Sequence, residues 1–115
     1  MQIPNTPLFV KTHDFNVWLI RHTQRFPKNL RASLSLRIEN AALEFQELLM
    51  MANSSRDVHR NHYLEQADGR LLGLRVLLRY TIDFELLGSG QYEFASKSLE
   101  ELGRLLGAWR KVSSR

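Results

Sequence analysis

The densest cluster of like charges in this chain lies between residues 21 and 31. It consists of four basic residues: Arg21, Arg25, Lys28 and Arg31. No acidic residue falls between Asp14 and Glu39, so the cluster carries one sign of charge. Guanidinium and ammonium groups held in the open contact phosphate oxygens, and arginine can do so with two parallel hydrogen bonds. The cluster therefore predicts a binding site for nucleic acid. The alternative is a solvated basic corner that binds nothing.

Charged residues also mark one side of a leucine-rich segment further along the chain. They are spaced 7, 4 and 4 residues apart, which places them along one side of a helix: Asp68, Arg75, Arg79 and Asp83. Arg79 and Asp83 are placed to pair directly. We favour a salt-bridge network between helices or subunits, because charges beside a core need partners. Phosphate contact is the alternative, with Arg75, Arg79 and Arg104 as second candidates after the basic cluster.

Two histidines raise the question of catalysis. His59 and His62 are three residues apart, a helical spacing that metal ligands use, but no third ligand is evident except nearby carboxylates. We therefore predict no metal site and no cofactor. Arg56 and His62 form an Arg-x5-His pattern that resembles the short motif of HEPN-type ribonucleases. A ribonuclease using these two residues is the lesser alternative, and no other catalytic constellation stands out.

Composition narrows the class of protein. The 115 residues are 43% hydrophobic and 24% charged, which predicts one globular domain over residues 1–115. The chain has no cysteine, which excludes disulfides and thiolate metal sites and fits a reducing compartment. The first residues lack the layout of a signal peptide, and no apolar run approaches the roughly 18 residues of a membrane span. We therefore expect a cytoplasmic protein without a membrane segment.

Apolar residues recur at helical spacing in four segments, and no segment alternates with the period of a strand. We expect helices over about 7–25, 28–53, 55–87 and 91–111. The second shows the pattern most clearly, with steps of 4, 3, 4, 3 and 4 between Leu34, Ile38, Ala41, Phe45, Leu48 and Ala52. Short connections make successive helices antiparallel, so the predicted fold is all-α, an up-down-up-down four-helix bundle.

Local signals predict where the helices end. Pro27 pushes the residue before it out of helical geometry and should end the first helix. Ser54, with Asp57 three residues on, matches a capping box for the third helix. Gly88-Ser89-Gly90 is expected to form the turn into the fourth helix.

Two pairs of glycines four residues apart, Gly69/Gly73 and Gly103/Gly107, fall inside the third and fourth expected helices. Each glycine costs a helix about 1 kcal/mol relative to alanine, so we expect a compensating close approach of helix backbones. The third helix also carries more apolar residues than one buried face needs, among them Leu72 and Val76. Together these features indicate that several copies of the bundle associate.

Three stretches, taken in order, resemble Avd-like proteins. The first is the corner Phe26-Pro27-Lys28 followed by Arg31, Leu34 and Arg37. The second is the third helix, with Tyr63-Leu64, Ala67-Asp68, Leu71, Leu74-Arg75 and Leu78-Arg79. The third is the fourth helix, with Tyr92, Leu99, Glu101, Gly103-Arg104, Leu106-Gly107 and Trp109. Avd is the accessory variability determinant of diversity-generating retroelements, and the resemblance covers nearly the whole chain past residue 7.

The resemblance implies a fold, an assembly and a role. Avd-like proteins are four-helix bundles that form a five-membered barrel, so a homopentamer is expected. They are basic and non-enzymatic, and they bind nucleic acid and the reverse transcriptase of the retroelement to support mutagenic reverse transcription of its template RNA into cDNA. A sister group of the same fold is encoded by intervening sequences of 23S ribosomal RNA genes. A structural bundle of that type, without a reverse transcriptase partner, is the main alternative.

Overall fold

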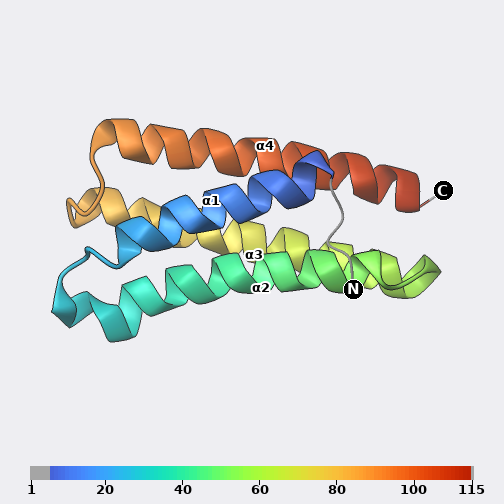
Figure 1. The fold of residues 1–115 in the computed structure, drawn as a ribbon, viewed down its shortest axis with the longest axis horizontal. Coiled ribbons are helices and arrows are strands. Elements are labelled where there is room, and N and C mark those ends of the chain that lie inside the picture. The colour runs from blue at the N-terminus through green and yellow to red at the C-terminus, as the bar shows by residue number, and fades with distance from the viewer. Residues whose placement is uncertain (1–5, 115) are drawn as a thin grey trace.

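The computed structural model describes residues 6–114, which form four long helices joined by short connections (Figure 1). The helices are α1 (Pro7–Thr23), α2 (Leu36–Asn53), α3 (Asp57–Asp83) and α4 (Ser89–Ser113), and two short turns, η1 (Lys28–Leu30) and η2 (Arg31–Ser35), precede α2. Among the described residues there is no strand, which confirms the all-α prediction. None of the described helices contains a stretch apolar enough to span a lipid bilayer. Residues 1–5, most of the stretch considered for a signal peptide, lie outside the described part.

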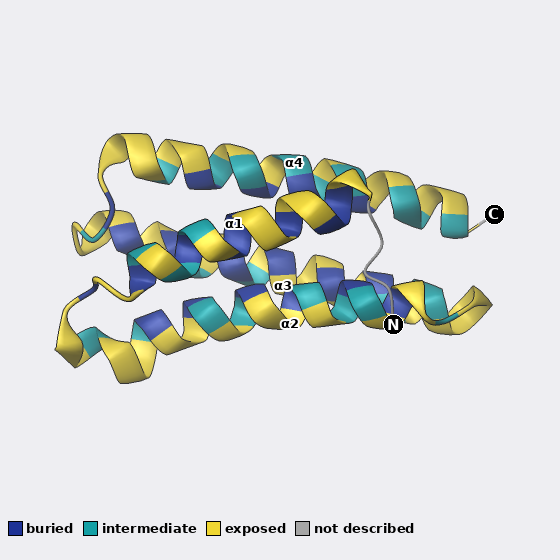
Figure 2. Cartoon of the chain, in the orientation of Figure 1, coloured by how far each residue is buried: buried dark blue, intermediate teal, exposed yellow. Residues whose placement is uncertain are grey.

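Successive helices run antiparallel, and each packs against the next (Figure 1). Because α1 also packs against α4, the four helices close into a bundle of 44 × 24 × 23 Å. Each helix buries one face toward the common axis, as Figure 2 shows. In α2 that face consists of Ile38, Ala42, Phe45, Leu49 and Ala52, which are spaced three or four residues apart. The four-helix bundle expected from the apolar spacing is therefore present in the structure.

The connection from α1 to α2 is more elaborate than one corner at Pro27. α1 ends at Thr23, and a turn follows in which the Phe26 N–H donates to the Thr23 carbonyl (3.1 Å). The second helix does not run regularly from residue 28, because η1 is a 3-10 turn and η2 is a π turn. In η2 the Leu36 N–H donates to the Arg31 carbonyl, five residues back instead of four. These turns bury Phe26 in the core and keep the neighbouring basic residues outside.

The capping box predicted at Ser54 and Asp57 is wrong. Ser54 Oγ donates to the Met51 carbonyl in the last turn of α2 (3.1 Å), and α3 begins at Asp57 instead of near residue 55. A side chain from α3 stabilises this junction, because Arg60 Nε donates to the Ala52 carbonyl (3.0 Å). The last carbonyls of a helix have no partner within it and attract cations. Arg60 therefore caps α2 from the next helix.

The third helix is also shorter at its C-terminal end than predicted. α3 ends at Asp83, and Glu85 takes a left-handed backbone conformation with φ of 55°. The Leu86 N–H then donates to the Thr81 carbonyl (2.8 Å), a bond typical of helices that end in a left-handed residue. The turn predicted at Gly88-Ser89-Gly90 therefore lies earlier in the chain. Gly88 occupies the N-cap of α4, and the two residues after it are helical.

Candidate nucleic-acid interface

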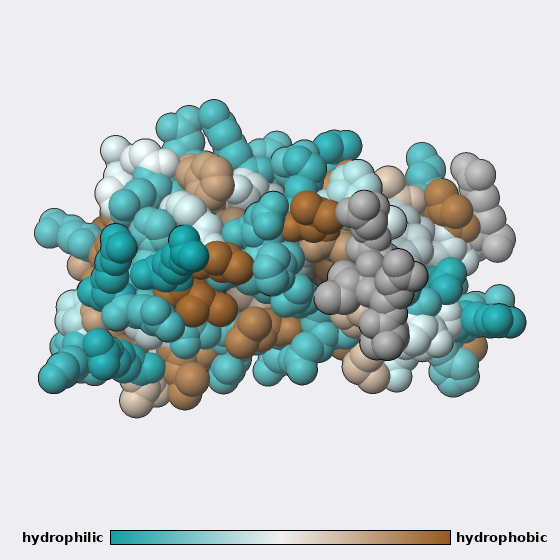
Figure 3. Space-filling model, in the orientation of Figure 1, coloured by the Kyte–Doolittle hydropathy of each residue, from teal (hydrophilic) through white to brown (hydrophobic). Residues whose placement is uncertain are grey.

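The predicted basic cluster forms one corner of the bundle, where the chain passes from α1 to α2. We call it the basic corner, and its four exposed members are Arg21, Arg25, Lys28 and Arg31. Arg21 comes from the last turn of α1, Arg25 from the turn after it, and the other two from η1 and η2. Hydrophilic side chains cover much of this end of the molecule, on the left in Figure 3. The fold therefore gathers residues from four successive segments on one accessible surface.

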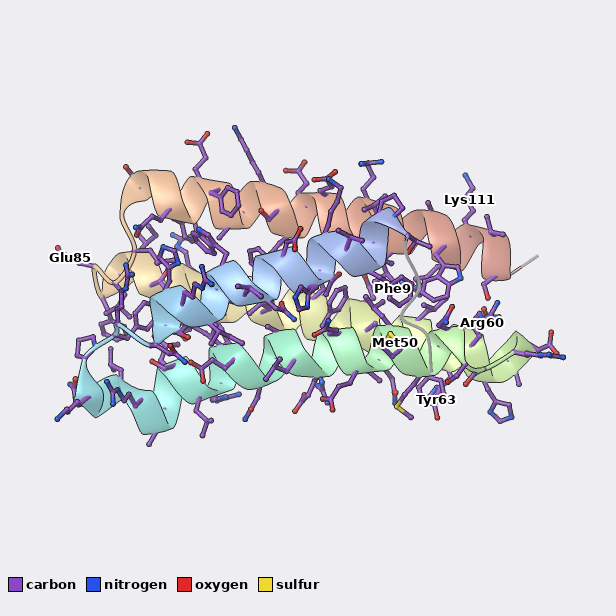
Figure 4. All side chains as sticks on the ribbon, viewed as in Figure 1. Phe9, Met50, Arg60, Tyr63, Glu85 and Lys111 are labelled. Atoms are coloured by element: carbon purple, nitrogen blue, oxygen red, sulfur yellow. The ribbon has the colours of Figure 1, made fainter. Side chains whose placement is uncertain are left out.

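The cations of the basic corner have no carboxylate partner in the described part of the chain. Glu39, the next acid in the sequence, accepts a hydrogen bond from the Thr23 hydroxyl instead (2.5 Å). Glu85 lies at the same end of the bundle, in the turn from α3 to α4 (Figure 4). Exposed cations without partners keep their hydrogen-bonding capacity for a phosphate ligand.

The second candidates for phosphate contact, Arg75, Arg79 and Arg104, lie on α3 and α4, and not all of them lack an ion pair. Arg104 pairs with Glu101 of its own helix (3.7 Å), so one of the second phosphate candidates already has a carboxylate partner. Asp68 pairs with Arg110 of α4 (3.3 Å), an ion pair between helices of the kind expected for this charged side of α3, although the sequence did not indicate Arg110 as the partner. The ion pair predicted between Arg79 and Asp83 is absent from the described part of the chain.

Arg75 is also without an ion pair among residues 6–114, and one of its guanidinium nitrogens lies beside Gly103 on α4. Arg75 and Arg104 therefore belong to the flank where α3 meets α4. Arg79 lies one turn further along α3, toward the end that carries the basic corner. Four exposed cations cluster at the corner, whereas this flank mixes arginines with and without an ion pair in residues 6–114, so the corner is the stronger candidate for phosphate contact.

The residues of the ribonuclease alternative lie at the start of α3, where Arg56 precedes the helix and His62 follows in its second turn. Both are exposed, and the His62 ring is within hydrogen-bond distance of the Gln66 amide (3.2 Å). This end of the bundle also holds Arg60 and Lys111, opposite Glu85 (Figure 4). Among the described residues, no three histidine, cysteine or acidic side chains are placed to share a metal ion.

α3 carries apolar side chains on its outer side as well as on its buried side. Leu72, Val76 and Tyr80 follow one another every four residues and are 64%, 57% and 48% exposed. We call these three residues the α3 stripe. A groove of about 610 Å³ between α2 and α3 runs beside it, lined in part by Leu72, Val76, Ala41 and Leu77. Contiguous exposed apolar surface of this kind marks an interaction site more often than a solvated face.

The glycine pairs do not bring helices together within one bundle. A Cβ atom on Gly69, Gly73 or Gly107 would meet nothing within 4 Å, and only Gly103 of the four has neighbours, one of them the Leu71 side chain at 3.4 Å. The close approach predicted from both pairs is therefore wrong within a single chain. Gly69 and Gly73 line the groove beside the α3 stripe, where missing side chains leave room for another molecule.

Arg60 has a structural role that the sequence does not predict. Its guanidinium carbon lies 6.0 Å from the centre of the Trp109 ring, while its Nε caps α2. Trp109 in turn packs against Phe9, with ring centres 5.8 Å apart. Arg60 of α3 thus contacts both α2 and α4 at the end away from the basic corner. No local sequence signal marks it, because its partners are 8 and 49 residues away in the chain.

The fold and its surfaces define a small antiparallel four-helix bundle with an outer apolar stripe and a basic corner that forms no ion pair within residues 6–114. The model of the bAvd-like family matches residues 8–113, so the chain belongs to this family. The match confirms the resemblance inferred from the three sequence stretches. Avd-like proteins are an accessory family and are not known as enzymes. A comparison with curated proteins gives no match.

Proposed function

We propose that this chain is a non-enzymatic accessory protein of a diversity-generating retroelement. It binds the reverse transcriptase of the element and holds nucleic acid, template RNA or cDNA, in the cytoplasm. Family membership supports the accessory role. The observation that carries the nucleic-acid role is the basic corner, whose four cations are exposed and form no ion pair within the described residues. Such cations bind phosphate groups of nucleic acid whatever the nucleotide sequence.

The proposed assembly is a homo-oligomeric ring, with five subunits as the family resemblance implies. Support comes from the α3 stripe, since a ring would remove its exposed apolar side chains from water. Association also multiplies the net charge of +4 per chain, which turns a modest charge into a strong field for a polyanion. The ring therefore strengthens the nucleic-acid role as well as covering the stripe.

Coexpression with a reverse transcriptase encoded by a neighbouring gene tests the accessory role. Affinity capture of this chain should recover the reverse transcriptase, because an accessory protein acts through the enzyme that it binds. The two proteins should stay together after nuclease treatment, which distinguishes a protein contact from tethering by a shared RNA. Loss of the reverse transcriptase on nuclease treatment would contradict a direct contact. A surrounding 23S ribosomal RNA gene with no reverse transcriptase nearby would support the structural alternative.

Incubation with single-stranded RNA tests the ribonuclease alternative. We expect the purified chain to leave the RNA intact, because Arg56 and His62 are exposed and the His62 ring is engaged with Gln66. The His62→Ala variant should behave in the same way, as judged by gel electrophoresis of an end-labelled RNA. Cleavage by the parent chain that disappears in His62→Ala would show an enzyme and overturn the accessory assignment.

A further inference from the structure

A polar pocket of about 480 Å³ opens beside the basic corner, between the end of α1 and the start of α2. Its lining comes from five residues: Thr23, Gln24, Arg31, Ser35 and Glu39. Every one of these side chains can donate or accept hydrogen bonds, and none is apolar. Arg31 belongs to both the pocket and the basic corner, so a ligand in the pocket would sit next to the proposed phosphate contacts.

Ser35 gives an independent sign that the pocket takes a ligand. The residue is 3% exposed, and its hydroxyl is the one buried side-chain polar atom in the described part without a hydrogen-bond partner. Several other helical hydroxyls bond back to a carbonyl three or four residues earlier, as Thr12 does to Leu8 (2.7 Å) and Ser98 to Phe94 (2.8 Å). Ser35 ends the π turn, where the Arg31 carbonyl accepts from the Leu36 N–H instead. A buried hydroxyl left unpaired is unfavourable, so a ligand that satisfies it gains affinity.

The charges of the pocket select the kind of ligand. Glu39 accepts from the Thr23 hydroxyl (2.5 Å), but it forms no ion pair with any cation of residues 6–114, and the same holds for Arg31. A lone carboxylate repels phosphate, so the phosphate groups should stay on the outer cations. The pocket instead suits a neutral group that donates to Glu39 and accepts from Arg31.

We propose that the pocket binds an unstacked guanine base of single-stranded nucleic acid, an inference that rests on the nucleic-acid role proposed above. Guanine N1–H and N2–H₂ are adjacent donors that match the two oxygens of the Glu39 carboxylate. Guanine O6 and N7 are acceptors that match the Arg31 guanidinium. Phosphates on either side of the base contact Arg21, Arg25 and Lys28. Proteins that read single-stranded RNA commonly combine a base pocket with backbone contacts in this way.

Short RNAs provide the probe. We compare a uridine oligomer of about 12 nucleotides with three copies that carry one central guanosine, adenosine or cytidine, using fluorescence anisotropy at fixed salt. The guanosine oligomer should bind about tenfold more tightly than the others, the discrimination expected of one well-matched base contact. Equal binding of all four oligomers would contradict base binding in the pocket and leave the phosphate role intact. Tighter binding of the adenosine or cytidine oligomer would contradict the assignment of guanine as the bound base. Failure of every oligomer to bind would overturn both.

Two variants test the residues directly. Glu39→Gln should reduce the preference for guanosine to about twofold or less, since the amide offers one acceptor where the carboxylate offers two. The matched control is Glu47→Gln, an exposed glutamate of α2 outside the pocket, which makes the same change in charge and should keep the preference. In the proposed complex the Ser35 hydroxyl donates to guanine O6 beside Arg31, so Ser35→Ala should lower the preference for guanosine. It should not lower the thermal midpoint, because this hydroxyl has no hydrogen-bond partner among the described residues. A full preference in both pocket variants would overturn the proposal.

Discussion

Replacing Arg21 and Arg25 together by glutamate should weaken binding of single-stranded nucleic acid at least about tenfold. Both side chains are exposed and form no ion pair within the described chain, so the change removes two phosphate contacts and adds two repulsive charges. Counterion release makes a second prediction possible. For single strands the slope of log K against log salt should fall in magnitude by about 1.4, about 0.7 for each lost contact. Fluorescence anisotropy across a salt series measures both quantities.

The control must separate a specific surface from total charge. The control variant carries Arg56→Glu and Lys111→Glu, two exposed residues at the opposite end of the bundle. It makes the same change in net charge, from +4 to zero (4 − 4 = 0). This control should keep most of the affinity and most of the slope. Equal losses in the two double variants would show that net charge, not the basic corner, carries the binding. A collapse of the thermal midpoint in the Arg21 and Arg25 variant would show that these arginines are structural.

Leu72→Arg should prevent the proposed homo-oligomer from forming and leave monomers. Leu72 is 64% exposed in the single chain, so the variant should fold normally, but an arginine in the subunit contact would be a buried charge without a partner. Light scattering in high salt after nuclease treatment measures the native mass. The parent should give a mass near 67 kDa, five times the 13.4 kDa of one chain, and the variant a mass near 13.4 kDa. Circular dichroism should show the same helical content in both.

Val112→Arg serves as the matched control for the stripe. Val112 is 63% exposed in the last turn of α4, and it receives the same substitution without touching the α3 stripe. The control should keep the mass of the parent. A parent chain that is already monomeric would remove the ring and leave the stripe without this role. An intact oligomer in Leu72→Arg would place the subunit contact elsewhere on the bundle.

Much of the fold follows from the spacing of apolar residues. The buried residues of α2 occur three or four apart in the sequence, as a helix with one buried face requires, and those of α3 and α4 follow the same rule. Short connections then require antiparallel neighbours. The basic corner was also predictable, because its four residues are close in sequence and the proline-containing connection keeps them at one end. The family was also predictable, because three stretches occur in the same order as in Avd-like proteins. The family model matches residues 8–113, which include all three.

The helix ends were less predictable, because distant groups compete with local caps. Ser54 carries the local signal for a cap, yet Arg60 reaches back from α3 to the end of α2. Glu85 adopts the left-handed conformation expected of a glycine, since ending α3 there lets Leu87 enter the core. Packing of an apolar side chain outweighs the small preference of one residue for one backbone conformation.

The sequence by itself determined the helical class, the family and the position of the charges along the chain. Only the tertiary structure decided which charges stay free, because an ion pair depends on where two helices meet. Asp68 pairs with Arg110 across 42 residues of sequence, while Arg79 and the nearer Asp83 form no ion pair with each other in the described chain. The pocket at Ser35 is likewise a product of the tertiary structure, since it needs the end of α1 beside the π turn that leads into α2.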